Sequence, residues 1–413
     1  MNCAMKSLAI ACLILTAGGC ATHAPMTSPT AGTYDADATK WSNAWVEVDA
    51  AAFERNIVRV RETIGQGTKL CATMKADAYR HGLALLTPSL IRQGVTCIGI
   101  ASNEEARIAR ELGFKGQILR LRSASTPEMV EGMRFAIEEL IGNPTAAKLL
   151  ADEAKKANKT VRIHMALNAG EMDRNGIEMR APDGRKQALD IIKTPNLRVV
   201  GIMTHFALED KDKIKAQAQA FSDDANWIIA NGGLRREDVT LHAANSYATM
   251  EVPEARFDMV RPGRILYGYS SYDQFEKLLT FKTRVTAVNS YLANTGVTYN
   301  HTYILKRDSR LANIPVGYAD AHRKAYTTGD VLIRGHKVPI VGAITMNTLM
   351  ADVTDYPDIS ANDEVVLYGA QSSSTLNGDD LQKFIKESMV EMTTRWSVNP
   401  RILRSPNGAV ARQ

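Results

Sequence analysis

The stretch KLCATMKADAYRHG (residues 69–82) has the pattern of a buried strand that ends at a lysine. Residues 70–74 are mainly apolar, and Lys75 follows in the same run. A lysine at a strand end is usually a solvated surface charge, but burying one is costly because desolvation disfavours the charged amine. The glycine-rich phosphate loop that usually follows the first strand of a doubly wound open sheet is missing here. The stretch therefore favours a barrel strand that carries a functional lysine.

Short apolar strands and helices continue to alternate after this stretch. Helical spacing is clear over 103–113 and 211–230, for example. Continuous apolar strands that alternate with helices are typical of a parallel sheet covered on both faces. Eight such units over roughly 220 residues fit an α/β fold of the (β/α)8 TIM-barrel type, whose usual size is about 250 residues. The eight strands are expected at 69–76, 96–102, 117–123, 138–144, 161–168, 198–206, 239–245 and 257–265.

The pattern changes at the C-terminal end of the expected barrel. Strand-like runs such as TRVTAVNSYL (283–292) and DEVVLYGA (363–370) are joined by Gly, Asn and Asp turns, and a helical stretch covers 379–396. On the N-terminal side, WVEVDA (45–50) is a strand pattern. We therefore expect a barrel over 41–280 and a second domain, rich in antiparallel β-structure, over 281–413.

The N-terminus has the features of a secretory signal peptide. One positive charge precedes the apolar run LAIACLILTA (8–17), and small residues follow it. The run is shorter than the roughly 20 apolar residues that span a bilayer. Cleavage after Ala24 would release a soluble protein, whereas cleavage before Cys20 would leave a lipidated cysteine at a membrane. Ala17 stands where lipoprotein signals prefer leucine, which favours release. The expected signal peptide is 1–24, followed by a polar linker over 25–40.

Composition narrows the possible partners. The chain has 413 residues, a formal net charge of +5 and 45% hydrophobic residues, as a soluble enzyme does. Its Lys and Arg residues are scattered, so we expect no nucleic-acid partner. Three of the five cysteines lie in the leader, which leaves Cys71 and Cys97. In an exported protein these two could form one disulfide, and neither has the spacing of a zinc site, so we expect no metal.

Polar side chains gather where the expected barrel strands end, which is where barrel enzymes carry their active sites. A lysine, a histidine, two arginines and hydroxyl donors there suit an anionic ligand, and the lysine could form a Schiff base. Each residue also has a plain structural explanation, since His205 could pack in the core, and Tyr79 and Ser246 could cap loops. The residues are Lys75, Tyr79, His81, Arg174, His205, Asn245, Ser246, Arg261 and Gly263.

The segment KADAYRHG resembles the pyridoxal 5'-phosphate (PLP) lysine motif of the alanine racemase family. Six further motifs follow in the order that the family shows, and the resemblance extends from WVEVD near residue 45 to NPRI near residue 402. One such motif would be a weak signal, but seven in order are a strong one. They are THF (204–206), HAANS (242–246), DMVRPG (258–263), LYG (266–268), VGYAD (316–320) and PIVGAITMN (339–347).

A narrower resemblance points to a subgroup of the family. HMALNAGEMDRNG (164–176) and SNEEAR (102–107) are similar to segments of exported broad-specificity amino-acid racemases of Gram-negative bacteria. Dedicated alanine racemases often have a carbamylated lysine in the first segment, where this chain has Ala166, Leu167 and Asn168. The resemblance implies a periplasmic enzyme of wide specificity, with Lys, Arg and Ala among its substrates. It also implies a Cys71–Cys97 disulfide, which similar exported enzymes carry.

The family resemblance also implies a two-base racemisation of free amino acids. Lys75 would hold PLP and act as one base, and Tyr318 from the partner subunit of a homodimer would act on the opposite face. Tyrosine is normally protonated at neutral pH, so its ionised form needs nearby positive charge, which Arg174 would supply. Arg261 would face the pyridine nitrogen. Tyr79, Ser246, Gly263 and Arg264 would hold the phosphate, His205 would support Arg261 or pack on the ring, and Arg174, Met346 and Tyr299 would contact the substrate.

Some positions depart from the family pattern. Arg80 replaces the usual glycine, and Arg264 stands where a small or apolar residue is common. Asn347 replaces the aspartate of dedicated alanine racemases, and Trp396 lies nearest to the place of a usual phosphate-binding tyrosine.

Several alternative functions remain. A dedicated alanine racemase, a PLP-binding protein without racemase activity and an exported barrel that binds cell-wall fragments are three of them. Basic amino-acid decarboxylases share the architecture, but they need an acidic partner for the pyridine nitrogen and usually a cysteine in the β domain. This chain has Arg261 and no cysteine after residue 97.

Overall fold

The computed structural model describes residues 38–169, 172, 175–269, 271–322, 329–382 and 388–404. The expected signal peptide, most of the linker and Arg174 lie outside these described residues.

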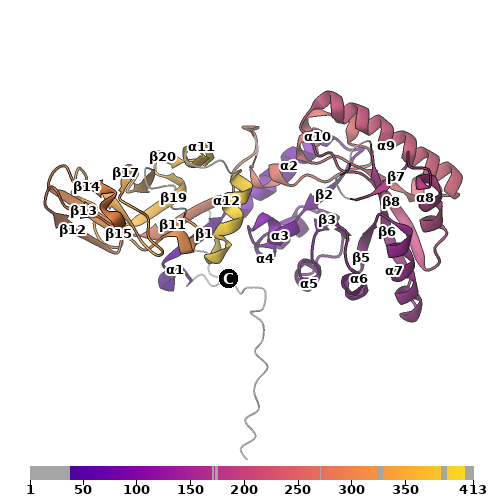
Figure 1. The fold of residues 1–413 in the computed structure, drawn as a ribbon, viewed down its shortest axis with the longest axis horizontal. Coiled ribbons are helices and arrows are strands. Elements are labelled where there is room, and N and C mark those ends of the chain that lie inside the picture. The colour runs from indigo at the N-terminus through magenta and orange to yellow at the C-terminus, as the bar shows by residue number, and fades with distance from the viewer. Residues whose placement is uncertain are drawn as a thin grey trace, which may run out of the picture. The chain divides into compact units, whose positions relative to one another are not determined.

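Eight parallel strands close into a barrel, which confirms the predicted α/β fold (Figure 1). The ring runs in the order β2-β3-β4-β5-β6-β8-β9-β10, and β10 pairs with β2 to close it. All eight strands lie where the sequence predicts them. Their bounds are β2 Lys69–Thr73, β3 Cys97–Ile100, β4 Gln117–Arg120, β5 Ile137–Ile141, β6 Val161–Asn168, β8 Leu197–Met203, β9 Thr240–His242 and β10 Met259–Val260, with β7 Ile177–Glu178 paired beside β6.

Helix α2 precedes the first barrel strand, the other helices lie between successive barrel strands, and together they cover the outside of the ring (Figure 1). Local signals set their ends: in α5, Ser102 and Glu105 form a capping box, and in α7, Asn143 caps a helix that starts with Pro144. The helices bury one side, as Phe53, Ile57 and Val60 of α2 show. Their bounds are α2 Ala50–Ile64, α4 Leu83–Arg92, α5 Asn103–Glu111, α6 Thr126–Gly132, α7 Pro144–Lys156, α8 Gly184–Ile192, α9 Lys211–Gly232 and α10 Ser246–Glu251.

The second sheet is mostly antiparallel and contains the C-terminal strands, as predicted. Strand β1 (Ala44–Val48) belongs to it as well, because β1 pairs with β11 and with the final strand β21. The described chain therefore enters this sheet first, forms the barrel and returns, so the predicted barrel range of 41–280 is wrong at its N-terminal end, where residues 44–48 belong to the second sheet. The other strands are β11 Leu279–Arg284, β12 Ala287–Tyr291, β15 Ser309–Ile314, β16 Asp330–Ile333, β17 His336–Val341, β18 Leu349–Asp352, β19 Glu364–Gln371, β20 Ser374–Leu376 and β21 Arg401–Leu403, with β13 Gly296–Val297 and β14 Tyr303–Ile304 forming a separate pair.

Short helices complete the described chain. They are α1 Ala38–Trp41, α3 Lys75–Tyr79, α11 Gly378–Gln382 and α12 Met389–Arg395, together with the 3-10 helices η1 Met133–Phe135, η2 Arg236–Asp238, η3 Pro253–Ala255, η4 Arg264–Tyr267, η5 Tyr299–His301, η6 Tyr318–Asp320 and η8 Trp396–Val398.

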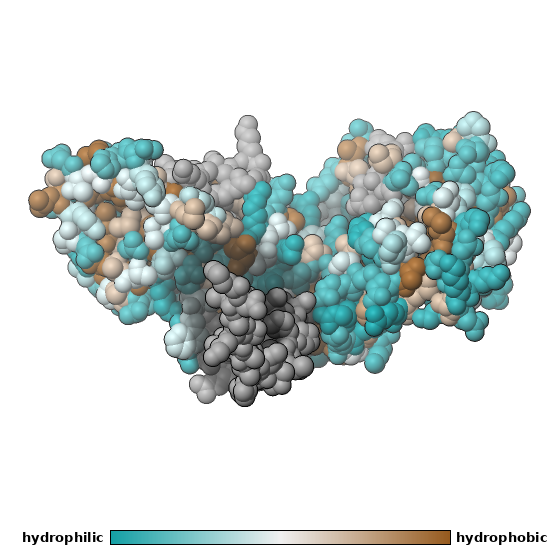
Figure 2. Space-filling model, turned by 60° about the horizontal axis from the view of Figure 1, so that its bottom comes forward, coloured by the Kyte–Doolittle hydropathy of each residue, from teal (hydrophilic) through white to brown (hydrophobic). Residues whose placement is uncertain are grey.

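The face shown in Figure 2 is mostly hydrophilic, with small separate hydrophobic areas. Within the described ranges, every helix is too short or too polar to cross a bilayer.

Candidate active site

A cavity of about 150 Å³ contains most of the predicted site residues. It lies at the C-terminal ends of the barrel strands, where barrel enzymes place their chemistry. Thr73, Leu121 and Glu209 also line it. The predicted residues that line it are Lys75, Tyr79, His205, Asn245, Ser246, Arg261, Gly263 and Arg264.

Lys75 enters this cavity from an unusual turn. The five residues that follow it, 76–80, are not glycine, yet all have φ between 52° and 65°. They form a left-handed turn with helical hydrogen bonds, Ala78 N–H to Met74 C=O and Arg80 N–H to Ala76 C=O, both 2.8 Å. Each L-residue in this conformation costs roughly 1–2 kcal/mol relative to the right-handed one. Contacts from the rest of the fold must therefore hold the left-handed turn.

The left-handed turn aims Tyr79 at Gly263, where the backbone comes very close. A Cβ atom at residue 263 would lie 2.2 Å from the Tyr79 hydroxyl oxygen, so only glycine fits. Beside it, Ser246 Oγ accepts hydrogen bonds from the N–H groups of Gly263, at 3.0 Å, and Ile265, at 3.4 Å. Two hydroxyls and two backbone N–H groups converge here. This donor set fits a phosphate group.

Two arginines near this donor set differ in their surroundings. Arg264 pairs with Glu209 at 2.6 Å, and both side chains are about half exposed, 50% and 53%. Arg80 is exposed, and its carbonyl oxygen accepts a hydrogen bond from Arg401 at 3.1 Å. The structure gives no physical reason for arginine in place of the usual glycine at position 80.

Arg261 is buried at the cavity wall, and backbone carbonyl groups accept hydrogen bonds from its guanidinium. One terminal nitrogen donates to the carbonyl oxygens of Thr204 at 2.7 Å and Ala243 at 3.1 Å. Thr73 Oγ1 in turn donates to the Arg261 carbonyl at 3.0 Å. The guanidinium thus has a fixed direction, which suits recognition of one acceptor atom.

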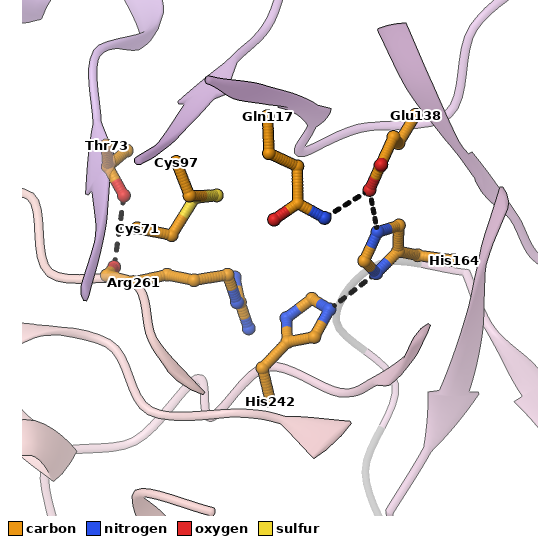
Figure 3. Close-up of a disulfide and its surroundings, with 8 residues drawn as sticks. All are labelled: Cys71, Thr73, Cys97, Gln117, Glu138, His164, His242 and Arg261. Carbon is orange, nitrogen blue, oxygen red and sulfur yellow. Dashed lines mark hydrogen bonds and ion pairs between the residues drawn. A yellow bond between two sulfur atoms is a disulfide. The ribbon is translucent and has the colours of Figure 1, made fainter. Parts of the chain in front are cut away.

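Behind Arg261, a chain of buried polar groups crosses the barrel interior (Figure 3). His242 Nε2 lies 2.8 Å from His164 Nδ1, and His164 Nε2 lies 2.7 Å from a Glu138 carboxylate oxygen. Gln117 and Arg162 donate to the same carboxylate. Burial lowers the pKa of His242, and the Arg261 cation lowers it further, so His242 stays neutral.

The tautomer of His164 sets the direction of these hydrogen bonds. If His164 is a neutral ring that donates from Nε2 to Glu138, its Nδ1 accepts from His242 Nε2, and His242 Nδ1 is left as an acceptor. In Figure 3 that Nδ1 faces the Arg261 guanidinium. Burial would raise the pKa of Glu138, but hydrogen bonds from His164, Gln117 and Arg162 lower it to about 2. Glu138 is therefore the negatively charged end of this series of hydrogen-bonded side chains.

The predicted site residues of the C-terminal domain are exposed and lie outside this cavity. Tyr318, Met346 and Tyr299 are 44%, 55% and 71% exposed. Tyr318 N–H donates to the Thr345 carbonyl at 3.1 Å, which keeps Tyr318 next to Met346. None of the three lines the cavity around Lys75 in the described part of the chain.

Asp320 fixes the turn that carries Tyr318. Its carboxylate accepts from Gly317 N–H at 3.0 Å and from Asn43 Nδ2 at 2.9 Å. These hydrogen bonds therefore fix the backbone turn that carries the exposed Tyr318.

The structure contains the Cys71–Cys97 disulfide. The two cysteines are paired in register on β2 and β3, and both are buried. The disulfide thus joins the strand that carries Lys75 to its neighbour. Among the described residues, no cluster of His, Cys, Asp and Glu could hold a metal ion.

Sequence reasoning missed several residues that shape the site. His164 and His242 lie on apolar strands, where a buried histidine resembles a packed core residue, so the sequence offers only a weak signal for them. Glu105 and Arg401, which contact the left-handed turn, had no local signal, because their contacts depend on the assembled fold.

Comparisons with known proteins agree with this geometry. The family model "Alanine racemase, N-terminal domain" matches residues 48–271, and "Alanine racemase, C-terminal domain" matches residues 278–404. The chain is 46% identical to a broad specificity amino-acid racemase of Aeromonas hydrophila and 47% identical to one of Pseudomonas putida, covering 88% of this chain and 90% of each relative. A lysine racemase of Proteus mirabilis is 40% identical with the same coverage.

Solved structures show the same fold. Alanine racemase from Streptomyces coelicolor is 28% identical, with a TM-score of 0.79 over 89% of this chain and 99% of that one. The enzyme from Clostridium difficile is 23% identical, with a TM-score of 0.82 over 90% of this chain and 98% of that one.

Proposed function

The chain belongs to the alanine racemase family, and on that premise we propose that it is an isomerase that uses PLP to racemise free amino acids with broad specificity. One observation carries the proposal: a single cavity holds Lys75 together with a set of donors that fits a phosphate and a buried arginine. A lysine and a phosphate site in one cavity suit a cofactor that has an aldehyde at one end and a phosphate at the other.

The residues that would hold PLP are already grouped. Lys75 would hold it covalently, while Tyr79, Ser246 and the N–H groups of Gly263 and Ile265 would bind its phosphate. Arg264 could join them by leaving Glu209. PLP supplies an electron sink for the bond that is broken at the substrate Cα.

Arg261 would face the pyridine nitrogen of the cofactor, with His205 beside it on the cavity wall. An arginine keeps its own proton in proteins and cannot protonate that nitrogen as a carboxylic acid would. Electron withdrawal by the ring is then weaker, which favours prompt return of the proton to Cα over side reactions.

Inversion at Cα needs proton donors and acceptors on both faces of the substrate. We assign these roles to the amine of Lys75 and the hydroxyl of Tyr318. Tyr318 is exposed and does not line the cavity of its own described chain, which supports a homodimer in which the partner's Tyr318 completes each site. Arg174, which the sequence resemblance assigns beside this tyrosine, lies outside the described residues.

Broad specificity rests on two further points. The relatives at 46–47% identity carry that name, and a 40% relative is a lysine racemase. Ala166, Leu167 and Asn168 occupy the segment of β6 where dedicated alanine racemases often have a lysine. Met346 and Tyr299, which are both exposed, are the proposed substrate contacts from the partner subunit.

We also propose export to the periplasm, because the sequence begins with the features of a secretory signal peptide.

The test is to load the purified mature protein with PLP and follow L-Ala, L-Lys and L-Arg separately by chiral chromatography. Racemisation of all three, lost in Lys75→Ala, is the expected result. Racemisation of alanine alone would make the protein a dedicated alanine racemase. PLP binding without racemisation of any of the three would contradict the catalytic assignment.

A further inference from the structure

We propose that Glu105 and Arg401 are positioning residues that hold the left-handed turn 76–80 and thereby keep Lys75 and Tyr79 in the geometry that binds the cofactor. The cofactor part of this inference rests on the proposed function, whereas the clamp on the backbone does not. The two residues reach the turn from different parts of the fold, α5 and β21.

Glu105 holds the turn from the side of α5. One carboxylate oxygen accepts from the Asp77 N–H at 3.0 Å. The other accepts from the N–H groups of Ala101, at 2.7 Å, and Ser102, at 3.1 Å. The residue is only 7% exposed. A single buried carboxylate therefore ties the turn after Lys75 to the start of the helix that follows β3.

Arg401 holds the same turn from the last strand of the chain. One of its terminal nitrogens contacts the Asp77 carboxylate in an ion pair and also donates to the Arg80 carbonyl at 3.1 Å. The Asp77 carboxylate also accepts from Leu83 N–H at 2.7 Å, at the first residue of α4. The Arg401 and Asp77 side chains are 16% and 25% exposed, so solvent screens this pair only in part. The contact joins residues 324 positions apart in the sequence.

The backbone of the turn needs such contacts because its residues do not favour its conformation. The side chain of Ala76 is exposed, so its packing does not hold its φ of 54°. Tyr79 is held differently: its ring stacks on Tyr267, with centroids 4.8 Å apart. Figure 1 shows α3, which contains most of the turn, beside α4 and α5. Loss of the clamp would let the turn relax, and the groups at its two ends, Lys75 and Tyr79, would move apart.

A purely structural role for Arg401, as an anchor for β21, predicts something different. Arg404 directly follows the same strand and pairs with Glu47 and Asp49, not with the turn. Arg404→Gln is therefore a matched control: it weakens the attachment of β21 and leaves the turn intact.

The experiment uses the full mature chain with Arg401→Gln, Glu105→Gln and Arg404→Gln. Amide hydrogen exchange of residues 76–83 is measured in cofactor-free protein, and the PLP dissociation constant is then measured by titration. We expect Arg401→Gln and Glu105→Gln each to speed exchange in 76–83 and to weaken PLP binding about tenfold or more, and Arg404→Gln to do neither. Glu105→Gln should loosen the turn because both carboxylate oxygens of Glu105 accept from backbone N–H groups. The amide NH2 of glutamine can only donate, so it cannot replace one of those oxygens.

A second substitution tests the cause. Adding Ala76→Gly to Arg401→Gln should restore part of the PLP affinity, since glycine adopts positive φ without a Cβ penalty. Equal effects of Arg401→Gln and Arg404→Gln, or unchanged exchange in 76–83 in both clamp variants, would overturn the inference. The exchange measurement needs no cofactor, so it stands even if the protein proves not to be a racemase.

Discussion

Gly263 lies very close to Tyr79, and this determines which residue can stand at position 263. A methyl group there would lie 2.2 Å from the Tyr79 hydroxyl, and Tyr79 cannot retreat freely because its ring stacks on Tyr267. Gly263→Ala should therefore displace Tyr79 and weaken PLP binding roughly tenfold or more, in line with an overpacking cost of about 1–3 kcal/mol. Titration of cofactor-free protein with PLP measures this. Gly67→Ala, with open space around the added methyl, is the control and should bind PLP normally.

His81 should make stability depend on pH. Burial lowers its pKa from 6.5 to about 3, outweighing its hydrogen bonds to the Ala78 and Tyr79 carbonyls. The folded protein therefore cannot bind a proton that the unfolded chain takes up below pH 6.5. Stability from this residue is full above pH 6.5 and falls by about 1.4 kcal/mol per pH unit as the pH drops toward 3.

Urea unfolding of cofactor-free protein at pH 7, 6 and 5 measures this slope. His81→Asn keeps a donor for the carbonyl oxygens but has no titrating group. The unfolding free energy of this variant should therefore fall less steeply with decreasing pH than that of the wild type, by the slope that corresponds to the uptake of about one proton on unfolding. Identical slopes in the two proteins would show that His81 is not buried as a neutral ring.

Single residues were predictable where a motif marks them. Lys75, Tyr79, Ser246 and Gly263 follow strand ends and do line one cavity. The polar chain behind Arg261 was not predicted, because an inward histidine on an apolar strand looks like any packed core residue. Its partner, Glu138, comes from a different strand, and no sequence spacing links the two.

At the scale of elements, two sets of contacts hold β2, the strand that leads to Lys75. The Cys71–Cys97 disulfide joins β2 to β3, and Glu105 and Arg401 hold the left-handed turn that follows β2. The disulfide closes a loop with a sequence separation of 26 residues. Replacing both cysteines by alanine should lower the free energy of unfolding by about 2–4 kcal/mol, because the unfolded chain regains freedom.

Denaturant unfolding followed by far-UV circular dichroism measures that loss. The oxidised wild-type protein is one reference, and wild type unfolded in the presence of a thiol reductant is a second, which should resemble the double variant. An unchanged midpoint in the double variant would mean that the strand pairing of β2 with β3 alone determines stability here.

The barrel elements were predicted well, because continuous apolar strands that alternate with amphipathic helices are a strong signal. The left-handed turn was not, since no residue in 76–80 is a glycine and local propensity opposes its conformation. Contacts from distant elements override that propensity. The pairing of β1 with β11 and β21 was also missed, because an alternating strand pattern predicts burial and not the neighbouring strand.

For the whole molecule, the first and last strands of the described chain pair with each other, and the last one contacts the turn beside the site. β21, the last strand, lies beside β1, and its Arg401 reaches the turn after Lys75. Yet the exposed Tyr318 belongs to a separate group of side chains from those around Lys75. The central claim of the proposed function is that each active site combines Lys75 of one subunit with Tyr318 of the partner subunit.

Hybrid dimers test this claim most directly. Lys75→Ala and Tyr318→Phe chains with different affinity tags are co-expressed, and the hybrid that carries both tags is purified and assayed for racemisation of L-alanine and L-lysine. If each site takes its two bases from different subunits, one site of the hybrid has both, and the hybrid should show about half of the wild-type activity per dimer while each parent dimer shows almost none. A hybrid as inactive as its parents would place both bases in one chain and contradict the account.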